Sequence, residues 1–303
     1  MQHTFDGSGE WLRCALHAHT TRSDGELAPE ALAAHYGRAG YDVLAITDHW
    51  RLTGAESDEL LVLASSELNC ILPDSRDGHV LAFGIEADPA ELGSEYAGLA
   101  RTADWIEEHG GVAYLAHPYW TGATPGRVDL PGNVYGIEVY NAGCELEVGR
   151  GLAGVHWDEL LESGTRCFAI ATDDSHHPGF DSDLAWTWIR AASRSREAVL
   201  DALREGTFYS STGPRVLGVE VGGDAIEVRC TPCRSVTLVA GRCQGAAAHA
   251  GRLPYCHRSK VLEQADDGRI TRARLELPSG AAHTRLELTD GDGGRAWTNP
   301  FWR

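Results

Sequence analysis

The chain has 303 residues, of which 43% are hydrophobic and 23% charged, as expected of a globular protein with one large domain or two smaller ones. Its one lysine, Lys260, excludes the lysine-containing phosphate loop of nucleoside triphosphatases and the catalytic lysine of protein kinases. The net charge of −18 argues against long duplex nucleic acid as a partner, because the charges would repel each other.

No stretch reaches the roughly 18 apolar residues of a membrane span, and residues 1–10 lack the apolar core of a signal peptide. We therefore predict a cytoplasmic protein with no membrane contact. The charge is unevenly distributed, because residues 214–303 hold 13 of the 26 basic residues but only 10 of the 44 acidic ones. Bound divalent cations would offset part of the negative charge carried by residues 1–213.

Short apolar runs alternate with helical stretches through residues 1–213. Strands are predicted at 11–19, 43–47, 60–65, 79–85, 112–116, 137–140 and 167–172, and helices at 29–40, 95–109 and 156–163. Continuous apolar strands separated by helices indicate a parallel sheet that is covered on both faces. About seven such strands favour a closed α/β barrel over an open sheet.

The pattern changes after Gly213 and Pro214. Short alternating runs at 219–221, 226–228, 236–239, 275–277 and 286–288 predict a small antiparallel β domain over residues 214–303. Within it, Cys230 and Cys233, with Cys243 and Cys256 downstream, could form a zinc site, but a second closely spaced pair is missing. We therefore expect residues 214–303 to supply no metal ligand.

Histidines and acids gather where the predicted strands of the first domain begin or end. His17 and His19 are two residues apart in a strand, so their side chains point to the same face. The other such residues are Asp24, His49, Glu67, His79, His117, Asp174 and His176. Parallel barrels carry their chemistry at the C-terminal ends of strands, and imidazole with carboxylate suits zinc, iron or manganese. The pattern predicts a site for more than one metal ion.

Five motifs resemble those of the PHP (polymerase and histidinol phosphatase) family and follow one another in the same order as in that family. They are HAHTTRSDG at 17–25, ITDH at 46–49, SE at 66–67, AHP at 116–118 and DSH at 174–176. The resemblance covers residues 11–213 and implies a distorted (β/α)7 barrel with two to three divalent metal ions. It implies a first metal position at His17, His19, Glu67 and Asp174, a second at Glu67, His79 and His117, and a third at Asp24, His49 and His176.

A second, narrower resemblance lies further along the chain. The segments GTFYSSTGP at 206–214 and WTNP at 297–300 are similar to CehA/McbA-type PHP proteins, which carry a C-terminal β domain. That subgroup includes a carbamate ester hydrolase, which widens the range of expected substrates.

Several residues outside the metal set are candidates for supporting roles. Arg22, Arg127 and His177 are predicted to bind a phosphate group. Asp48 and Asp173 either accept hydrogen bonds from ligand side chains or bond to backbone. Glu138 and Asn141 end a strand and are predicted to hold water or substrate.

These features together predict a phosphoesterase for a small phosphorylated substrate, either a phosphomonoester or a phosphodiester such as a nucleotide or an oligonucleotide end. A hydroxide bridging two ions would attack phosphorus, and Asp174, Glu67 and His176 are the predicted catalytic residues. Two alternatives stay open. The same site could hydrolyse a carbamate, carboxylic ester or amide, or the domain could be a regulatory module without activity.

Overall fold

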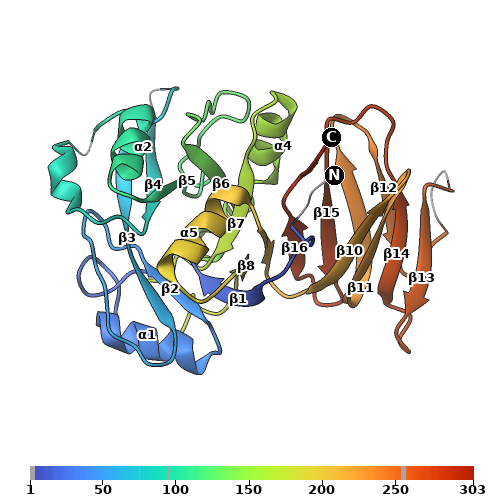
Figure 1. Ribbon diagram of the computed structural model, residues 1–303, viewed down its shortest axis with the longest axis horizontal. Coiled ribbons are helices and arrows are strands. Elements are labelled where there is room, and N and C mark those ends of the chain that lie inside the picture. The colour runs from blue at the N-terminus through green and yellow to red at the C-terminus, as the bar shows by residue number, and fades with distance from the viewer. Residues whose placement is uncertain (1–3, 75, 95, 254–256) are drawn as a thin grey trace. The chain divides into compact units, whose positions relative to one another are not determined.

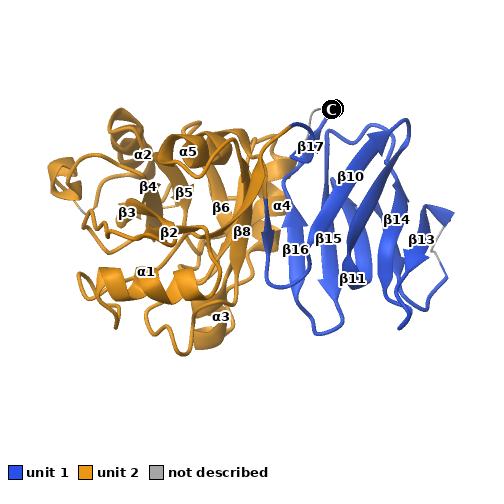
Figure 2. Ribbon diagram, turned by 60° about the horizontal axis from the view of Figure 1, so that its bottom comes forward, with its two compact units in different colours: residues 1–7, 209–303 blue, residues 8–208 orange. Residues whose placement is uncertain are grey.

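Two units divide the chain, as Figure 2 shows by colour: Ser8–Phe208 forms an α/β unit, and Tyr209–Arg303 with the residues up to Gly7 forms a β unit. The sequence had suggested a boundary at residues 213–214, slightly later, and had not grouped the N-terminal residues with the second unit. The computed structural model describes residues 4–74, 76–94, 96–253 and 257–303.

The α/β unit interleaves strands with short helices. Its strands are β1 (Glu10–Ala15), β2 (Val43–Ile46), β3 (Leu61–Ile71), β4 (Asp77–Phe83), β5 (Val112–Leu115), β6 (Val134–Asn141), β7 (Phe168–Thr172) and β8 (Trp186–Ala191). Its helices are α1 (Pro29–Arg38), the 3₁₀-helix η1 (Pro89–Leu92), α2 (Leu99–Glu108), α3 (Ala142–Val148), α4 (Gly154–Glu162) and α5 (Arg196–Glu205). The helix expected at 95–109 begins at Leu99, and Glu95 lies outside the described residues. Strand β8, the 3₁₀-helix η1 and helices α3 and α5 were not among the predicted elements.

The strands pair in the order β8-β1-β2-β3-β4-β5-β6-β7. Strands β1 to β3 run parallel, as do β5 to β7, but β4 is antiparallel to both neighbours and β8 is antiparallel to β1. The prediction of a wholly parallel sheet is therefore wrong at two strands. Few residues separate Ile71 from Asp77, and a parallel crossover needs about a dozen. The prediction of a mixed α/β architecture with a large sheet is confirmed.

The outer strands β7 and β8 are linked by a side chain. The Thr187 hydroxyl in β8 donates to the backbone oxygen of Ala171 in β7 at 3.1 Å and accepts from its N–H at 3.2 Å. Thr187 is fully buried, so its hydroxyl cannot bond to water. These two bonds take the place of the hydrogen bonds to water that the hydroxyl loses on burial.

Both faces of the central strands are buried. Leu12 and Cys14 of β1 belong to one apolar cluster, whereas Ala15 packs with Leu32 and Tyr36 of α1 in a second cluster. Successive side chains of a strand point to opposite faces, so β1 contributes to both. Figures 1 and 2 show α1 and α2 on opposite sides of strands β2 to β4. None of the described helices is long and apolar enough to cross a membrane.

The elements described in the β unit are strands, and their pairings are antiparallel. They are β9 (Phe208–Ser211), β10 (Val216–Gly222), β11 (Ala225–Ala240), β12 (Gly245–His249), β13 (Ser259–Gln264), β14 (Ile270–Glu276), β15 (His283–Asp290), β16 (Arg295–Thr298) and β17 (Phe301–Trp302). Strand β11 changes register around Cys233, close to Pro232, which cannot donate to a ladder.

The cysteines considered for zinc are placed differently from one another. Cys230 and Cys233 are buried in β11, Cys243 is exposed, and Cys256 lies outside the described residues. The Cys230 thiol donates to the backbone oxygen of Ile270 at 3.6 Å. The expectation that this unit supplies no metal ligand stays a prediction.

Candidate metal centre

The structure brings nine histidine and acidic side chains to one rim of the α/β unit. His17 and His19 follow β1, His49 follows β2, and His117 follows β5. The nine form three groups, each able to hold a metal ion: His17, His19, Glu67 and Asp174 (first group), Glu67, His79 and His117 (second group), and His19, Asp24, His49 and His176 (third group).

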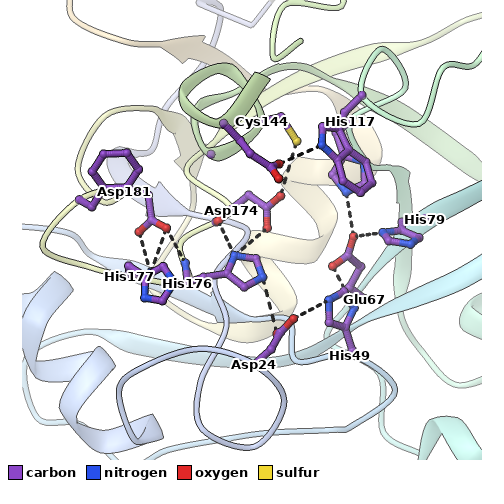
Figure 3. A pocket seen from close by; sticks show the side chains of 14 residues that line it. Asp24, His49, Glu67, His79, His117, Cys144, Asp174, His176, His177 and Asp181 are labelled. Atoms are coloured by element: carbon purple, nitrogen blue, oxygen red, sulfur yellow. Dashed lines mark hydrogen bonds and ion pairs between the residues drawn. The ribbon is translucent and has the colours of Figure 1, made fainter. Parts of the chain in front are cut away.

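Strand direction explains why His79 joins the others although it lies near the start of its strand. Strand β4 is antiparallel to β3, and His79 pairs with Asn69 near the end of β3. The beginning of β4 therefore meets the C-terminal ends of the parallel strands at the same rim. Figure 3 shows the result, with His79 and His49 on either side of Glu67.

Four distances between ligand atoms of the first group match those expected around a tetrahedral ion. Nε2 of His17 lies 3.2 Å from Glu67 Oε2 and 3.1 Å from Asp174 Oδ1, and Nε2 of His19 lies 3.3 and 3.2 Å from the same two oxygens. Four ligands about 2.0 Å from a tetrahedral ion would stand roughly 3.3 Å apart. Nε2 of both histidines and Asp174 Oδ1 are buried and have no hydrogen-bond partner among the described residues. These residues therefore fit a metal ion.

The second group uses the other oxygen of Glu67. Oε1 accepts hydrogen bonds from Nδ1 of His79 at 2.7 Å and Nε2 of His117 at 2.9 Å. The other ring nitrogen of His79, Nε2, lies 3.0 Å from the side-chain amide nitrogen of Asn69. The side-chain oxygen of Asn69 accepts a hydrogen bond from the Trp50 indole at 2.9 Å. Glu67 can therefore contribute one oxygen to each of two groups.

The third group is looser and more open to solvent. Asp24 Oδ1 lies 3.6 Å from Nε2 of His176 and from Nδ1 of His19, and Asp24 Oδ2 lies 3.5 Å from Nε2 of His49. The Asp24 side chain is 54% exposed and that of His49 31%. The His19 and His176 rings stack with their centroids 4.2 Å apart. His19 faces the first group with Nε2 and the third group with Nδ1.

Burial and charge shift the ionisation of these groups in opposite directions. Burial alone would lower the pKa of His19, but the carboxylates of Asp174 and Glu67, 3.2 and 3.3 Å from its Nε2, raise it to about 9. Burial would raise the pKa of Glu67 and of Asp174, yet neighbouring histidines lower both. Burial would also lower the pKa of His17, but the charges of Asp174, Glu67 and Glu138 outweigh burial and raise this pKa overall. Without metal, the centre therefore holds ion pairs.

Two of the nine residues have a left-handed backbone, with φ of 23° at His117 and 55° at Asp174. Such values are uncommon for residues other than glycine, and strain of this kind is found at functional sites. The Asp174 N–H donates to the backbone oxygen of His17 at 3.0 Å, which ties the end of β7 to the end of β1. Long-range backbone bonds therefore support the strained conformation.

The sequence did not identify Glu138 of β6 as a partner of a metal-capable residue. It is fully buried and accepts from Nδ1 of His17 at 2.8 Å, the backbone N–H of His117 at 2.7 Å, Thr172 at 2.5 Å and Asn141 at 2.9 Å. Burial would raise the pKa of Glu138, but the His17 charge and hydrogen bond lower it overall. A carboxylate in this position fixes the tautomer and orientation of a metal-binding histidine.

Asn141 is a second partner, at the beginning of α3. Its side-chain oxygen caps the helix by accepting from the Cys144 N–H at 2.9 Å. Its amide nitrogen donates to Glu138 and, at 3.0 Å, to Asp174 Oδ2. Asn141 is fully buried and is not among the residues that line the pocket, which disfavours the direct contact with substrate suggested by the sequence.

Asp48 and Asp173 accept hydrogen bonds from neighbouring loops. Asp48 accepts from the backbone N–H of Thr20 at 2.7 Å and from the hydroxyls of Thr20 and Ser23 at 2.6 and 2.7 Å. Asp173 accepts from Tyr36 and from three backbone N–H groups at residues 183–185. Of the two roles considered for Asp48 and Asp173, these contacts support hydrogen bonding to backbone and neighbouring loop residues rather than to the side chains of metal-capable residues.

The 20–25 loop that carries Asp24 folds back closely on the backbone of His19. A Cβ at Gly25 would lie 2.2 Å from the backbone oxygen of His19, so any larger residue would collide with backbone there. Hydrogen bonds from the Gly25 and Ser23 N–H groups to the Thr20 oxygen close the loop, at 2.9 and 3.0 Å. Together with Asp48, these contacts direct Asp24 toward the histidines.

A cavity of about 460 Å³ opens over the centre. The metal-capable residues that line it are Asp24, His49, Glu67, His79, His117, Asp174 and His176. Of the residues predicted to bind phosphate, His177 lines the cavity, whereas Arg22 and Arg127 are exposed and do not. Asp181 accepts from the backbone N–H groups of His176 and His177, both at 2.9 Å, and so holds this part of the wall (Figure 3).

A scan against protein families finds no match for this sequence. A search of curated proteins also finds none. Solved structures do match. A two-domain protein of Bacteroides vulgatus, described as containing a predicted PHP-like metal-dependent phosphoesterase, aligns with 97% of this chain and 96% of its own at 16% identity and a TM-score of 0.55. This confirms, at the level of the fold, the likeness to PHP proteins that the motifs predicted.

Two further structures align with part of the chain. One, an amidohydrolase from Chromobacterium violaceum with bound sulfate and no metal, covers 55% of this chain and 89% of its own at 18% identity and a TM-score of 0.39. The other, a candidate metal-dependent phosphoesterase from Bifidobacterium adolescentis, covers 63% and 94% at 15% identity and a TM-score of 0.41. At these TM-scores neither likeness supports an argument about this chain.

Proposed function

We propose that this protein, which shares the fold of a PHP-like two-domain protein, is a metal-dependent hydrolase that cleaves a small phosphomonoester or phosphodiester. The first group carries the proposal. Nε2 of His17, Nε2 of His19 and Asp174 Oδ1 are buried without hydrogen-bond partners among the described residues, and all three face one another. Polar atoms buried without hydrogen bonds cost free energy, and a bound cation would offset that cost.

We assign each of the three groups to a divalent metal position and expect two to three bound ions. Imidazole with carboxylate suits zinc, manganese and iron. Glu67 supports a shared role, because Oε2 faces the first group and Oε1 faces the second. His19 joins the first and third groups in the same way through its two ring nitrogens.

When bound, divalent metal ions would lower the pKa of a coordinated water and neutralise charge on the oxygens of the attacked ester. The chain holds the ligands and presents them to substrate. Glu138 fixes His17 with Nε2 directed at the centre. Glu67, Asp174 and His176 belong to the metal-capable groups, and all three also line the cavity. This supports their assignment as catalytic residues.

The volume of the cavity and the net charge of the chain favour a small substrate. A cavity of about 460 Å³ lies within the range of small-molecule sites. The net charge of −18 disfavours long duplex nucleic acid, and we propose a cytoplasmic location. We also interpret the strand order, which returns from β7 to β8 through Thr187, as a distorted barrel of the PHP type, followed by an all-β domain.

A second candidate function is hydrolysis of a carbamate, carboxylic ester or amide at the same centre. Within the described part of the chain, no arginine or lysine lines the cavity. An uncharged substrate needs no such residue, whereas phosphate commonly pairs with arginine.

Elemental analysis and a substrate panel test both candidates. After reconstitution with zinc, manganese or iron, we expect two to three ions per chain. A content of one or none would contradict the assignment. The panel contains p-nitrophenyl phosphate, bis-p-nitrophenyl phosphate, a nucleotide bisphosphate and an aryl carbamate. Turnover of the carbamate alone would favour the second candidate.

A matched pair of variants locates the activity. Asp174→Asn removes a ligand charge at the first group while keeping the side-chain shape, so activity should be lost. Asp58→Asn makes the same change at an exposed position outside the cavity lining and should leave activity unchanged. Full activity in Asp174→Asn would show that the catalytic metals are held elsewhere.

A further inference from the structure

The part of the cavity lining that lies outside the three metal-capable groups, called the wall below, has an unusual composition for a phosphate-binding site. Its members are Trp120, Gly143, Cys144, Glu147, His177, Phe180 and Asp181. Two of them are aromatic and two are acidic, and the lining described contains no arginine or lysine. The part of a substrate that extends away from the metal-capable groups must therefore contact rings and carboxylates.

Trp120 is held in one orientation at the edge of this wall. Its indole N–H donates to Glu147 Oε2 at 3.1 Å, and its ring lies edge-to-face with His117 at a centroid distance of 5.1 Å. The side chain is nevertheless 37% exposed, so part of the ring is open to a ligand. A ring that is already oriented loses little conformational entropy when it stacks with a planar group.

The charges on this wall oppose a second anion. Glu147 is exposed, and the described residues place no basic side chain in an ion pair with it. Asp181 is satisfied by backbone N–H groups and a serine hydroxyl. His177 also belongs to the wall, and its ring lies 3.6 Å from the Glu26 carboxylate. A negatively charged group next to Glu147 would be repelled.

We propose that the substrate carries an uncharged planar ring that stacks on Trp120, and that Glu147 selects against a second anionic group on that ring. The inference rests on the proposed function only in assuming that one end of the substrate lies at the metal-capable groups. It names the substrate class as esters of an aromatic or heteroaromatic alcohol without a further phosphate or carboxylate.

Binding of non-hydrolysable probes tests this directly. With manganese-loaded protein, isothermal calorimetry should show phenylphosphonate binding several-fold more tightly than methylphosphonate, because only the phenyl group can stack. Trp120→Ala should weaken phenylphosphonate by about 3- to 10-fold, the effect expected of one aromatic pair, and should leave methylphosphonate unchanged. Equal affinity of the two probes for the unaltered protein would overturn the proposal, as would equal weakening of both by the variant.

Tyr119→Ala is the matched control, because this neighbouring aromatic residue is 41% exposed but does not line the cavity. It should bind both probes as the unaltered protein does. A selective loss of phenylphosphonate in this variant would contradict the role of Trp120. The manganese content of each variant, measured on the same samples, shows that the centre itself is intact.

Glu147→Gln tests the charge separately, since the amide oxygen can still accept from the Trp120 indole. Phenylphosphonate affinity should stay within about twofold, and 4-carboxyphenylphosphonate should bind several-fold more tightly than to the unaltered protein. No gain for the carboxylated probe would overturn the role of Glu147. If the probes behave as expected but no phosphoester is hydrolysed, the proposed phosphoesterase function fails, and the preference of this site for an uncharged ring stands. If p-nitrophenyl phosphate is hydrolysed but phenylphosphonate binds no more tightly than methylphosphonate, the proposed function stands and this inference fails.

Discussion

Glu138 and His17 form a fully buried hydrogen bond of 2.8 Å between a carboxylate oxygen and Nδ1. The bond leaves Nε2 of His17 facing Glu67 and Asp174. Glu138 accepts three further hydrogen bonds, from His117, Asn141 and Thr172. One carboxylate thus connects four segments of the chain that surround the first group.

Glu138→Gln should weaken metal binding by about 10- to 100-fold, the range found for outer partners of metal ligands. All four contacts to Glu138 come from donors, and an amide would direct its own N–H₂ at two of them. Competition with a chelator measures the affinity. The same substitution at Glu145, which also accepts a backbone hydrogen bond but lies outside the cavity lining, is the control. Unchanged affinity in Glu138→Gln would refute the role of this residue.

Metal affinity should increase with pH between about 6 and 9. His19 has a pKa of about 9 without metal, and the pKa of His17 is also raised, so both are protonated near neutral pH. Ligation requires the neutral imidazole, so each bound histidine must release a proton. The apparent affinity should increase about tenfold per pH unit for each proton released. Calorimetry in buffers of different ionisation enthalpy counts these protons, and a count of zero would contradict the ion-paired description.

Asn69→Asp should strengthen metal binding at the second group. The Trp50 indole donates to the Asn69 oxygen, so the Asn69 amide nitrogen faces Nε2 of His79 and forces the His79 proton onto Nδ1, the atom nearest Glu67. An aspartate would accept from Nε2 and leave Nδ1 free to ligate. Elemental analysis at limiting metal concentration would show the higher occupancy.

Asn69→Ala separates the tautomer from the added charge. It removes the opposing donor without introducing a carboxylate, and should raise occupancy by less than Asn69→Asp does. If only the aspartate variant binds more metal, the effect is due to charge and the tautomer argument is wrong.

Asp48→Asn should reduce metal binding at the third group and spare the first. Asp48 accepts three hydrogen bonds from Thr20 and Ser23, in the loop that carries Asp24. An asparagine has one acceptor oxygen in place of two, so it could keep at most the two bonds that now end on Oδ1. The pKa of Asp48 is lowered because these hydrogen bonds outweigh burial. Metal titration should therefore lose its weakest step. Loss of every ion would indicate that the substitution disrupts the whole centre.

The local sequence was sufficient for the metal-capable residues themselves. The two-residue spacing of His17 and His19, and the positions of His49 and Asp174 after apolar runs, each follow from a few neighbouring residues. Strand period and strand ends are local properties, so these positions could be predicted without knowing which strands pair.

Other features required the three-dimensional arrangement. The direction of β4, which brings His79 to the rim, depends on pairing with β3 and β5. The role of Glu138 depends on His17, far away in the sequence. Arg127, predicted near the substrate, is exposed outside the cavity lining, which includes Trp120 from the same connection.

The physical difference is one of range. Burial, strand period and turn chemistry act between neighbours in the chain, so composition and spacing were enough to place His17, His19 and Asp174 at strand ends. Hydrogen-bond partners, strand direction and the charge around a cavity arise between segments brought together only by folding. The contacts of Glu138 with His17 and of Trp120 with Glu147 therefore became visible only in the folded chain.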